Sequence, residues 1–372
     1  MVFDNRRRSA GPARPEEVER PVASRGERAV CPAAAVPSSP GPAGNGRAHV
    51  HIAALVDSPE QLLATAAAFV DEGLRVGDLV VLACPADTVD SVRSALGERA
   101  GPVEADHRIA LAGTRPPDAF TLHDTLLERA ARSRSGRLRV LGQVVFGGDE
   151  VAWREGERYE SAANAVLARS PLTAMCLYDR SVLPPAIIAS ARATHPLVHD
   201  SRGLRTNPGF QEPIAYVRRL PVPREPVEAR PPVFDLRAAS SLPALRHALR
   251  DVLAAHVPDE EQFGDLYLGV SEVAANAFRH GRRPVSARVW ADGTRLVCTV
   301  TDAGRVFDDP LAGFVPARGR DLSRGGMGLW LARKLFDSVD LLPGDEGFTV
   351  RLSTALRAAP ADTVRAMPRR MP

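Results

Sequence analysis

The feature that most constrains the fold is one long segment whose apolar residues recur at helical spacing. The segment reads EEQFGDLYLGVSEVAANAFRHG, and its final glycine, Gly281, is typical of a helix end. An apolar stripe at this spacing predicts a helix with one face packed on a core. The stripe consists of Leu266, Val270, Val273 and Ala277.

A polar edge runs beside this stripe. Glu272, Asn276 and His280 follow one another at intervals of one helical turn, so they share a neighbouring face. Asn276 can offer its carbonyl oxygen to Mg²⁺, which prefers oxygen ligands. Glu272 can orient or deprotonate a nucleophile through a bound water. Taken alone, the pattern fits a magnesium–nucleotide site and an ordinary polar helix edge equally well.

A hairpin follows, and its second strand ends in an acidic turn. The hairpin turns at Asp292-Gly293 and ends at Asp302-Ala303-Gly304. An aspartate at a strand end can accept a hydrogen bond from an exocyclic amine such as that of adenine. A glycine there lets the backbone approach a flat ring closely. By itself, such a turn is also a common structural feature.

A glycine-rich turn then precedes another helix and a last strand. The turn contains Gly325, Gly326 and Gly328, and the inward residues predicted for the helix are Leu329, Ala332, Leu335 and Phe336. A glycine-rich turn at a helix start presents free backbone N–H groups to phosphate. The last strand, in GDEGFTVRLST, returns Thr349 to the sheet.

These motifs, in this order, resemble the N, G1 and G2 boxes of the GHKL ATPases. The boxes are Glu272-x-x-x-Asn276, Asp302-x-Gly304 and Gly326-x-Gly328. Within the superfamily, SEVAANAFRHG is most similar to the serine kinase and anti-sigma factor branch. The resemblance covers about a third of the chain. It implies the GHKL (Bergerat) α/β sandwich, with helices on one face of a mixed sheet.

The resemblance also implies ATP and Mg²⁺ as cofactors and a role for each matching residue. Glu272 would be the general base, and Asn276 would hold the metal. Asp302 would bind the adenine amine, and Gly304 would shape the base pocket. The remaining nucleotide-binding residues would be Gly326 and Gly328 as a lid over the phosphates, Thr349 near the adenine, and His280 in a less defined role.

Three functions follow as hypotheses. The first is an anti-sigma-type serine/threonine protein kinase whose partners are a sigma factor, a STAS-type antagonist, or both, with a possible homodimer. The second is a regulator that binds ATP and a partner without phosphate transfer. The third is a sensor histidine kinase, which needs an acceptor histidine on a dimerising helical hairpin. Only one helix fits before the long one, and His247 and His256 lack a following acidic residue. We therefore favour the first.

The region 48–212 alternates apolar strands with helices, which predicts a doubly wound α/β domain. Predicted strands include HVHIAALVDS, LVVLACP, RIALAG, LRVLGQVVF and LTAMCLYD. The stretch SPEQLLATAAAFVDEGLRVGD should form a helix, with Ser58 as its N-cap and Gly73 near its end. Lys334 is the only lysine, so the region has no Walker A motif.

This region resembles the MEDS sensory domain, a RecA/KaiC-like module without a phosphate loop. The matching stretches are FVDEGLRVGDLVVLAC, LRVLGQVVF, RYESAANAV and AMCLYDRSVLPP. The resemblance implies a small-molecule ligand, proposed for the family as hydrocarbon derivatives. Candidate positions are His51, Cys84, Glu160, Tyr178 and Asp179, for each of which capping or packing is an equal interpretation. HPLVHD holds two histidines at a spacing of four, and we favour a loop without metal there.

Outside 48–212, the chain is divided into one further domain, a linker and two tails. Residues 1–47 are predicted to be a disordered tail, 213–232 a proline-rich interdomain linker, 233–356 the ATP-binding domain, and 357–372 a flexible tail.

The composition argues against several classes of partner and location. The net charge is +3 and aromatic residues are 5%, so no nucleic-acid surface is expected. No apolar run reaches the ~20 residues of a membrane span. The four scattered cysteines indicate neither disulfides nor a CxxC metal site, and we expect a cytoplasmic protein.

Overall fold

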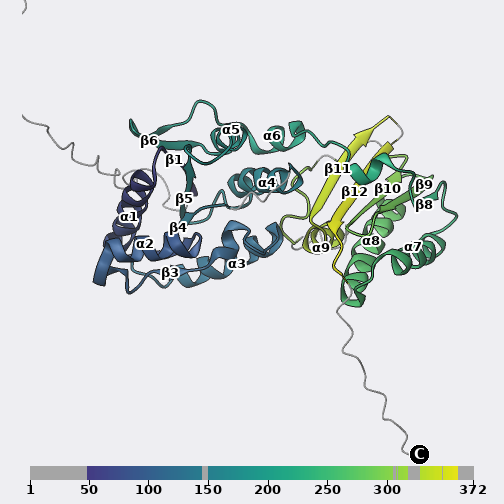
Figure 1. Ribbon diagram of the computed structural model, residues 1–372, viewed down its shortest axis with the longest axis horizontal. Coiled ribbons are helices and arrows are strands. Elements are labelled where there is room, and N and C mark those ends of the chain that lie inside the picture. The colour runs from purple at the N-terminus through teal and green to yellow at the C-terminus, as the bar shows by residue number, and fades with distance from the viewer. Residues whose placement is uncertain are drawn as a thin grey trace, which may run out of the picture. The chain divides into compact units, whose positions relative to one another are not determined.

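The structure is a computed structural model that describes residues 48–144, 150–304, 307, 309–316, 327–345 and 347–358. It contains two separate β-sheets, each with its own helices (Figure 1). The predicted N-terminal tail, Gly326 and nearly all of the predicted C-terminal tail lie outside the described residues. Within the described part of the chain, no helix combines the length and the apolar character that a membrane crossing requires.

The N-terminal sheet has seven strands in the order β3-β2-β4-β5-β1-β6-β7. All neighbours are parallel except β6 and β7, which are antiparallel. The strands are β1 (Val50–Val56), β2 (Leu79–Ala83), β3 (Glu104–Ala105), β4 (Leu138–Gly142), β5 (Leu172–Asp179), β6 (Leu197–Asp200) and β7 (Gly203–Thr206). The helices are α1 (Pro59–Val76), α2 (Ala86–Leu96), α3 (Pro116–Ala130), α4 (Glu150–Val166), α5 (Pro185–Thr194) and α6 (Pro213–Arg219), with short 3₁₀ turns η1 (Gly97–Ala100) and η2 (His107–Ala110).

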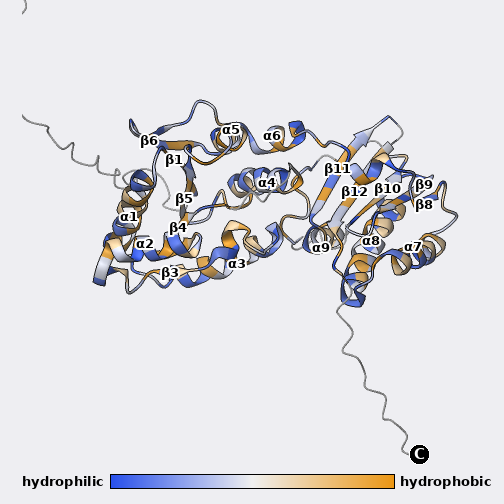
Figure 2. Ribbon diagram, in the orientation of Figure 1, coloured by the Kyte–Doolittle hydropathy of each residue, from blue (hydrophilic) through white to orange (hydrophobic). Residues whose placement is uncertain are grey.

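Helices cover both faces of this sheet. Val80 and Leu82 pack with α1 and α2, whereas Val81 and Ala83 pack with α3 and α4. The alternation follows from the two-residue period of a strand, and a strand buried on both faces reads as a continuous apolar run. Hydrophilic and hydrophobic residues accordingly share each helix (Figure 2). The doubly wound architecture is thus confirmed, and the finer likeness to RecA or KaiC stays a prediction.

The predicted bounds of the first helix are confirmed, and one predicted strand was wrong. Ser58 caps α1, accepting a hydrogen bond from Gln61 N, and Gly73 lies near the helix end, which is capped by Gly77 with a left-handed φ of 87°. Gly73 lies inside the helix, where an added Cβ would come within 2.3 Å of the Arg139 side chain. RIALAG was predicted to be a strand, but 107–110 form η2. The turn ends at Leu111 with φ of 63°, a conformation that a strand cannot contain.

The C-terminal sheet has five strands in the order β11-β12-β10-β9-β8. A mixed sheet was expected, but every pair is antiparallel, because each neighbour is reached through a hairpin or a returning connection. The strands are β8 (Phe234–Leu236), β9 (Val285–Ala291), β10 (Arg295–Asp302), β11 (Ser338–Gly344) and β12 (Gly347–Ala355). Their helices are α7 (Leu242–His256), α8 (Glu260–His280) and α9 (Met327–Leu335).

The three helices pack on one face of this sheet around a single apolar core. The predicted stripe of α8 is buried, with Leu266 and Val270 fully inaccessible to solvent. Side-chain caps begin the helices, since Ser241 accepts from Ala244 N and Asp259 accepts from Gln262 N. The sequence-based prediction of this helix layer is confirmed.

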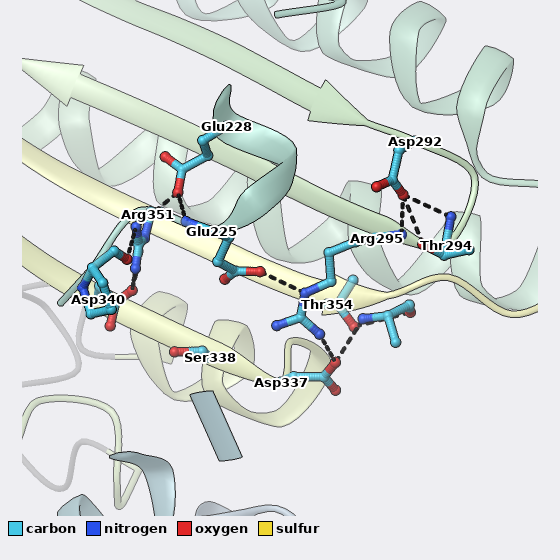
Figure 3. Close-up of polar contacts among 12 residues, drawn as sticks. Glu225, Glu228, Asp292, Thr294, Arg295, Asp337, Ser338, Asp340, Arg351 and Thr354 are labelled. Atoms are coloured by element: carbon cyan, nitrogen blue, oxygen red, sulfur yellow. Dashed lines mark hydrogen bonds and ion pairs between the residues drawn. The ribbon is translucent and has the colours of Figure 1, made fainter. Parts of the chain in front are cut away.

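The predicted linker contains structure. Its second half forms the 3₁₀ turn η3 (Pro226–Ala229), which packs on the face of the C-terminal sheet away from the helices. Figure 3 shows the ion pairs that hold it there. Arg351 Nη1 lies 2.9 Å from Glu228 Oε2, and Arg295 Nε lies 2.7 Å from Glu225 Oε2. Because these carboxylates are buried, the segment is fixed to the sheet and does not behave as a free tether.

Candidate functional site

A cavity of about 370 Å³ opens beside α8 in the C-terminal domain. Its walls are mostly apolar and come from α8, β10, α9 and β12, and this volume falls in the range of small-ligand sites. The lining residues are Val273, Asn276, Ala277, His280, Gly281, Val300, Asp302, Gly304, Phe307, Ala312, Leu329, Phe348 and Val350. Four predicted site residues, Asn276, His280, Asp302 and Gly304, are therefore brought together.

Asp302 is the buried charged group of this cavity, with 7% of its surface exposed. Its Oδ1 accepts hydrogen bonds from the backbone N–H of Arg282 at 3.0 Å and of Gly304 at 2.7 Å. Among the described residues, none donates a hydrogen bond to Oδ2. The carboxylate is thus fixed in place by one oxygen and has the other available to a ligand.

Two glycines make room for this carboxylate. A Cβ added at Gly281 would lie 2.3 Å from Asp302 Cγ, and one added at Gly304 would lie 2.5 Å from Asp302 Oδ1. No side chain fits at either position without moving the aspartate. The glycine that ends α8 and the glycine of the strand-end turn therefore serve the same acidic group.

The start of α9 lies against the polar edge of α8. A Cβ added at Gly328 would come within 2.6 Å of Asn276 Nδ2 and 3.4 Å of Glu272 Cβ. Helix α9 has nine residues, and the backbone N–H groups of its first turn lie beside Asn276 and Glu272. These are the residues predicted to hold the metal ion and to act as the general base. Gly326, the other predicted lid residue, lies outside the described residues.

Glu272 lies on α8 one turn from Asn276, with 37% of its side chain exposed. Its nearest ion-pair partner is Arg246 of α7, whose Nη2 lies 3.9 Å from Glu272 Oε1. Arg246 also donates to the carbonyl of Ser271 at 3.3 Å. The sequence analysis did not include Arg246, because nothing in the order of the motifs predicts which residue of α7 faces α8.

Thr349 is not brought to the cavity. Phe348 and Val350 line it, so the intervening side chain points to the opposite face of the sheet. There, Thr349 Oγ1 lies 2.8 Å from Thr301 Oγ1, its partner in the β10–β12 register. The two-residue period of the strand predicts this difference, and Phe348 is the neighbour that lines the cavity.

The apolar walls were also missed as site residues. Val300 and Leu329 read only as core positions, because their spacing is that of buried residues in any strand or helix. Phe307, which is 45% exposed, lies 5.6 Å from the ring of Phe348, measured between centroids. Exposed aromatic surface beside a cavity is a signal that only the structure reveals.

Three of the N-terminal candidates make ordinary structural contacts. Cys84 Sγ donates to the carbonyl of Leu141, and burial raises the pKa of this thiol to about 12. Asp179 Oδ1 accepts from the N–H and the hydroxyl of Ser181. Tyr178 is fully buried in the core. These contacts favour capping and packing for these positions.

Comparison with known proteins assigns both domains. Residues 50–196 match the family described as MEDS, the MEthanogen/methylotroph, DcmR Sensory domain. Residues 235–354 match the family described as Histidine kinase-like ATPase domain. No curated protein matches the chain.

One similar solved structure is that of the RsbU and RsbW domains of a Mycobacterium tuberculosis protein, at 22% identity and a TM-score of 0.25. The similarity covers 35% of this chain and 35% of that one, so it spans about a third of either protein. The two family matches, together with the sheets and the cavity described above, show that the chain carries a MEDS domain in its N-terminal part and a histidine kinase-like ATPase domain in its C-terminal part.

Proposed function

We propose that the C-terminal domain binds Mg·ATP in the cavity beside α8 and acts as a serine/threonine protein kinase of the anti-sigma type. The observation that carries the proposal is the fixed carboxylate of Asp302 at one end of an apolar cavity. A flat, uncharged ring with one exocyclic amine fits such a cavity, because the amine meets the available oxygen while the ring contacts apolar side chains.

Each residue of the site would have a separate role in binding or phosphate transfer. Bound Mg·ATP would supply the transferable phosphoryl group and the charge of the metal. Asn276 would hold the metal ion through its amide oxygen, and the backbone N–H groups at the start of α9 would face the phosphates. Glu272 is not among the residues that line the cavity, but it lies one helical turn from Asn276 with 37% of its side chain exposed, and it would accept the proton of a partner's hydroxyl group. The partner would be a STAS-type antagonist, with a sigma factor bound nearby.

The base assignment is tested by radiolabel transfer from ATP to a STAS-type protein from the same organism. Glu272→Gln should lower transfer by about 100-fold or more, the usual size of a general-base contribution, with the ATP affinity little changed. Glu261→Gln is the matched control, since Glu261 lies on the same helix with 85% of its side chain exposed. Transfer that is equally fast in wild type and Glu272→Gln would remove Glu272 from the mechanism.

A second candidate is a regulator that binds ATP and a partner without phosphate transfer. The contact between Glu272 and Arg246 favours it, because a carboxylate oxygen that faces a guanidinium 3.9 Å away is not directed at the hydroxyl group of a partner. Under this hypothesis no label moves in any variant, and ATP only changes the affinity for the partner. Calorimetry of partner binding with and without Mg·ATP distinguishes the two.

A sensor histidine kinase is the third candidate, and the name of the matched ATPase family is what favours it. In the described chain between β8 and α8 there is one helix, α7, and it carries His247 and His256. Autophosphorylation that is stable to base and labile to acid would establish this activity. It would overturn the serine/threonine proposal.

The MEDS domain is proposed to sense a small molecule and to change the affinity of the ATPase domain for nucleotide or partner. Such coupling requires the ligand to bind differently to the two states of the protein. A ligand that saturates the MEDS domain while the affinities for Mg·ATP and for the partner stay the same would contradict it.

A further inference from the structure

Four polar side chains meet inside the MEDS domain, where apolar packing would be expected. They are His51 of β1, Glu160 of α4, Cys176 of β5 and His195 just after α5, with exposures of 3%, 3%, 7% and 0%. Cys176 pairs with Ala53 in the parallel β1–β5 register, which makes it a diagonal neighbour of His51 on the same face. The four residues come from four elements, and their ligand atoms all lie within 4.8 Å of one another.

Four of the six separations between the ligand atoms are close to those around one small ion. Glu160 Oε2 lies 3.1 Å from His51 Nε2 and 3.3 Å from His195 Nε2. Cys176 Sγ lies 3.5 Å from His51 Nε2 and 3.8 Å from Glu160 Oε2. Zinc bonds of about 2.0–2.3 Å in tetrahedral geometry place ligand atoms about 3.3–3.7 Å apart.

The Nδ1 atoms of His51 and His195 both donate hydrogen bonds to neighbouring oxygens. His195 Nδ1 lies 2.9 Å from the carbonyl of Ala191, which can only accept. His51 Nδ1 lies 3.1 Å from Asn164 Oδ1. The amide of Asn164 cannot be turned round, because its Nδ2 donates to three carbonyls, among them that of Thr194 at 2.7 Å. Both Nδ1 atoms therefore carry the proton.

This arrangement leaves both Nε2 atoms facing a carboxylate. With Nδ1 protonated, a neutral imidazole has a lone pair on Nε2, and a lone pair is repelled by Glu160 Oε2 at hydrogen-bond distance. His195 Nε2 indeed has no hydrogen-bond partner of acceptable geometry. A second proton on each ring would resolve the repulsion but would place two cations beside one anion in the core.

A divalent cation resolves both problems at once. It accepts the lone pairs of two neutral histidines, and its charge balances one carboxylate and one thiolate. Nδ1 donation to a carbonyl is also the usual support of a metal-bound histidine. A cavity of about 30 Å³ borders His51, Glu160 and Cys176, so the site is not closed by aliphatic side chains on every side.

We propose that His51, Glu160, Cys176 and His195 bind one divalent transition metal ion, of which Zn²⁺ fits best. Imidazole, thiolate and carboxylate together are a ligand set of zinc, and four protein ligands make a closed site that stabilises the fold. The pair in HPLVHD does not act as a unit. His195 contributes, whereas His199 lies on β6 outside the cluster.

Metal content and cobalt substitution of the full chain test the proposal. The protein is expressed in medium with Zn²⁺ or Co²⁺ and purified without chelator, because buried ligands would exchange slowly after folding. We expect one metal per chain by elemental analysis. We also expect the cobalt form to show the intense visible bands of four-coordination and an ultraviolet thiolate-to-cobalt band. A wild-type protein that folds without metal and shows no cobalt bands would overturn the proposal, leaving a hydrogen-bonded core cluster only.

Cysteine variants assign the thiolate. Cys176→Ser should remove the ultraviolet band, whereas Cys84→Ser should keep it, since Cys84 is also buried but donates to Leu141. Cys31→Ser controls for the one cysteine outside the described residues. A band that survives in Cys176→Ser overturns the ligand set even if that variant is less stable. Removal of metal from the wild type should lower the melting temperature of the MEDS domain and leave the affinity for Mg·ATP unchanged.

Discussion

The cavity beside α8 and the cluster around Glu160 both present a buried carboxylate, but they differ in what surrounds it. Asp302 is fixed by two backbone N–H groups, and its second oxygen faces an open cavity. Glu160 faces two imidazoles and a thiol in a nearly closed space. The first arrangement suits a ligand that comes and goes, and the second suits an ion that stays.

The two sites also differ in how they are encoded. The cavity beside α8 is formed by short motifs in which one residue requires another, as Asp302 requires glycine at positions 281 and 304. The cluster is assembled by the parallel sheet, which brings residues 51 and 176 together across more than a hundred positions. Local sequence can therefore predict the first kind of site, and only tertiary structure reveals the second.

The largest effect should come from Asp302→Asn, which tests whether the open oxygen is what binds the base. In the variant, the oxygen of the introduced amide would still accept hydrogen bonds from the N–H groups of Arg282 and Gly304. Its NH₂ group, however, would replace the open oxygen and face the exocyclic amine, so that two donors would meet. We expect the affinity for Mg·ATP to fall by about 100-fold, or about 2.7 kcal/mol, in calorimetry. Asp292→Asn, at the other end of the same strand pair, should bind normally. Equal affinities in the two variants would mean that the cavity is not the adenine site.

The helices and strands of the ATPase domain were largely predictable because caps and periodicity agree. Asp259 caps the start of α8 and Gly281 caps its end, and Gly293, with φ of 88°, forms the turn of the predicted hairpin.

Other elements were missed where local signals are weak. In the MEDS domain, helix α3 was missed, since its start at Pro116 follows an arginine that makes no side-chain cap. Strand β11 was missed because SVDLLPG has no clear alternation, and its pairing with β12 is a tertiary contact. The side chain of Thr349 faces away from the cavity, and the motif alone does not show this because it does not distinguish the two faces of a strand.

A smaller effect on Mg·ATP binding is expected from Gly281→Ala, because the space beside Asp302 requires a residue without a side chain at position 281. Gly281→Ala would place a methyl group 2.3 Å from Asp302 Cγ and 2.6 Å from the carbonyl of Ala277, so the turn must shift. We expect a loss of about 1–3 kcal/mol in the free energy of unfolding, with weaker Mg·ATP binding. Gly264→Ala is the control on the same helix, since a Cβ there meets nothing within 4 Å. It should stabilise the domain by about 0.8–1 kcal/mol. Urea unfolding of both variants checks the pair, and matching signs would contradict the steric argument.

The smallest effect concerns the core around the cluster, through a histidine that is not one of its ligands. His123 on α3 is 4% exposed, and burial lowers its pKa below the usual 6.5, although its Nδ1 donates to the carbonyl of Ala119 at 2.9 Å. Below pH 6.5 the unfolded chain therefore binds a proton that the folded domain does not, and stability falls as the pH falls. His123→Gln should make this fall shallower by up to about 1.4 kcal/mol per pH unit, and the variant His107→Gln, at an exposed position, serves as the control. Urea titrations of the MEDS domain transition on either side of pH 6.5 measure the difference. An unchanged slope in His123→Gln would show that the buried core, unlike the open cavity, tolerates the charged imidazole.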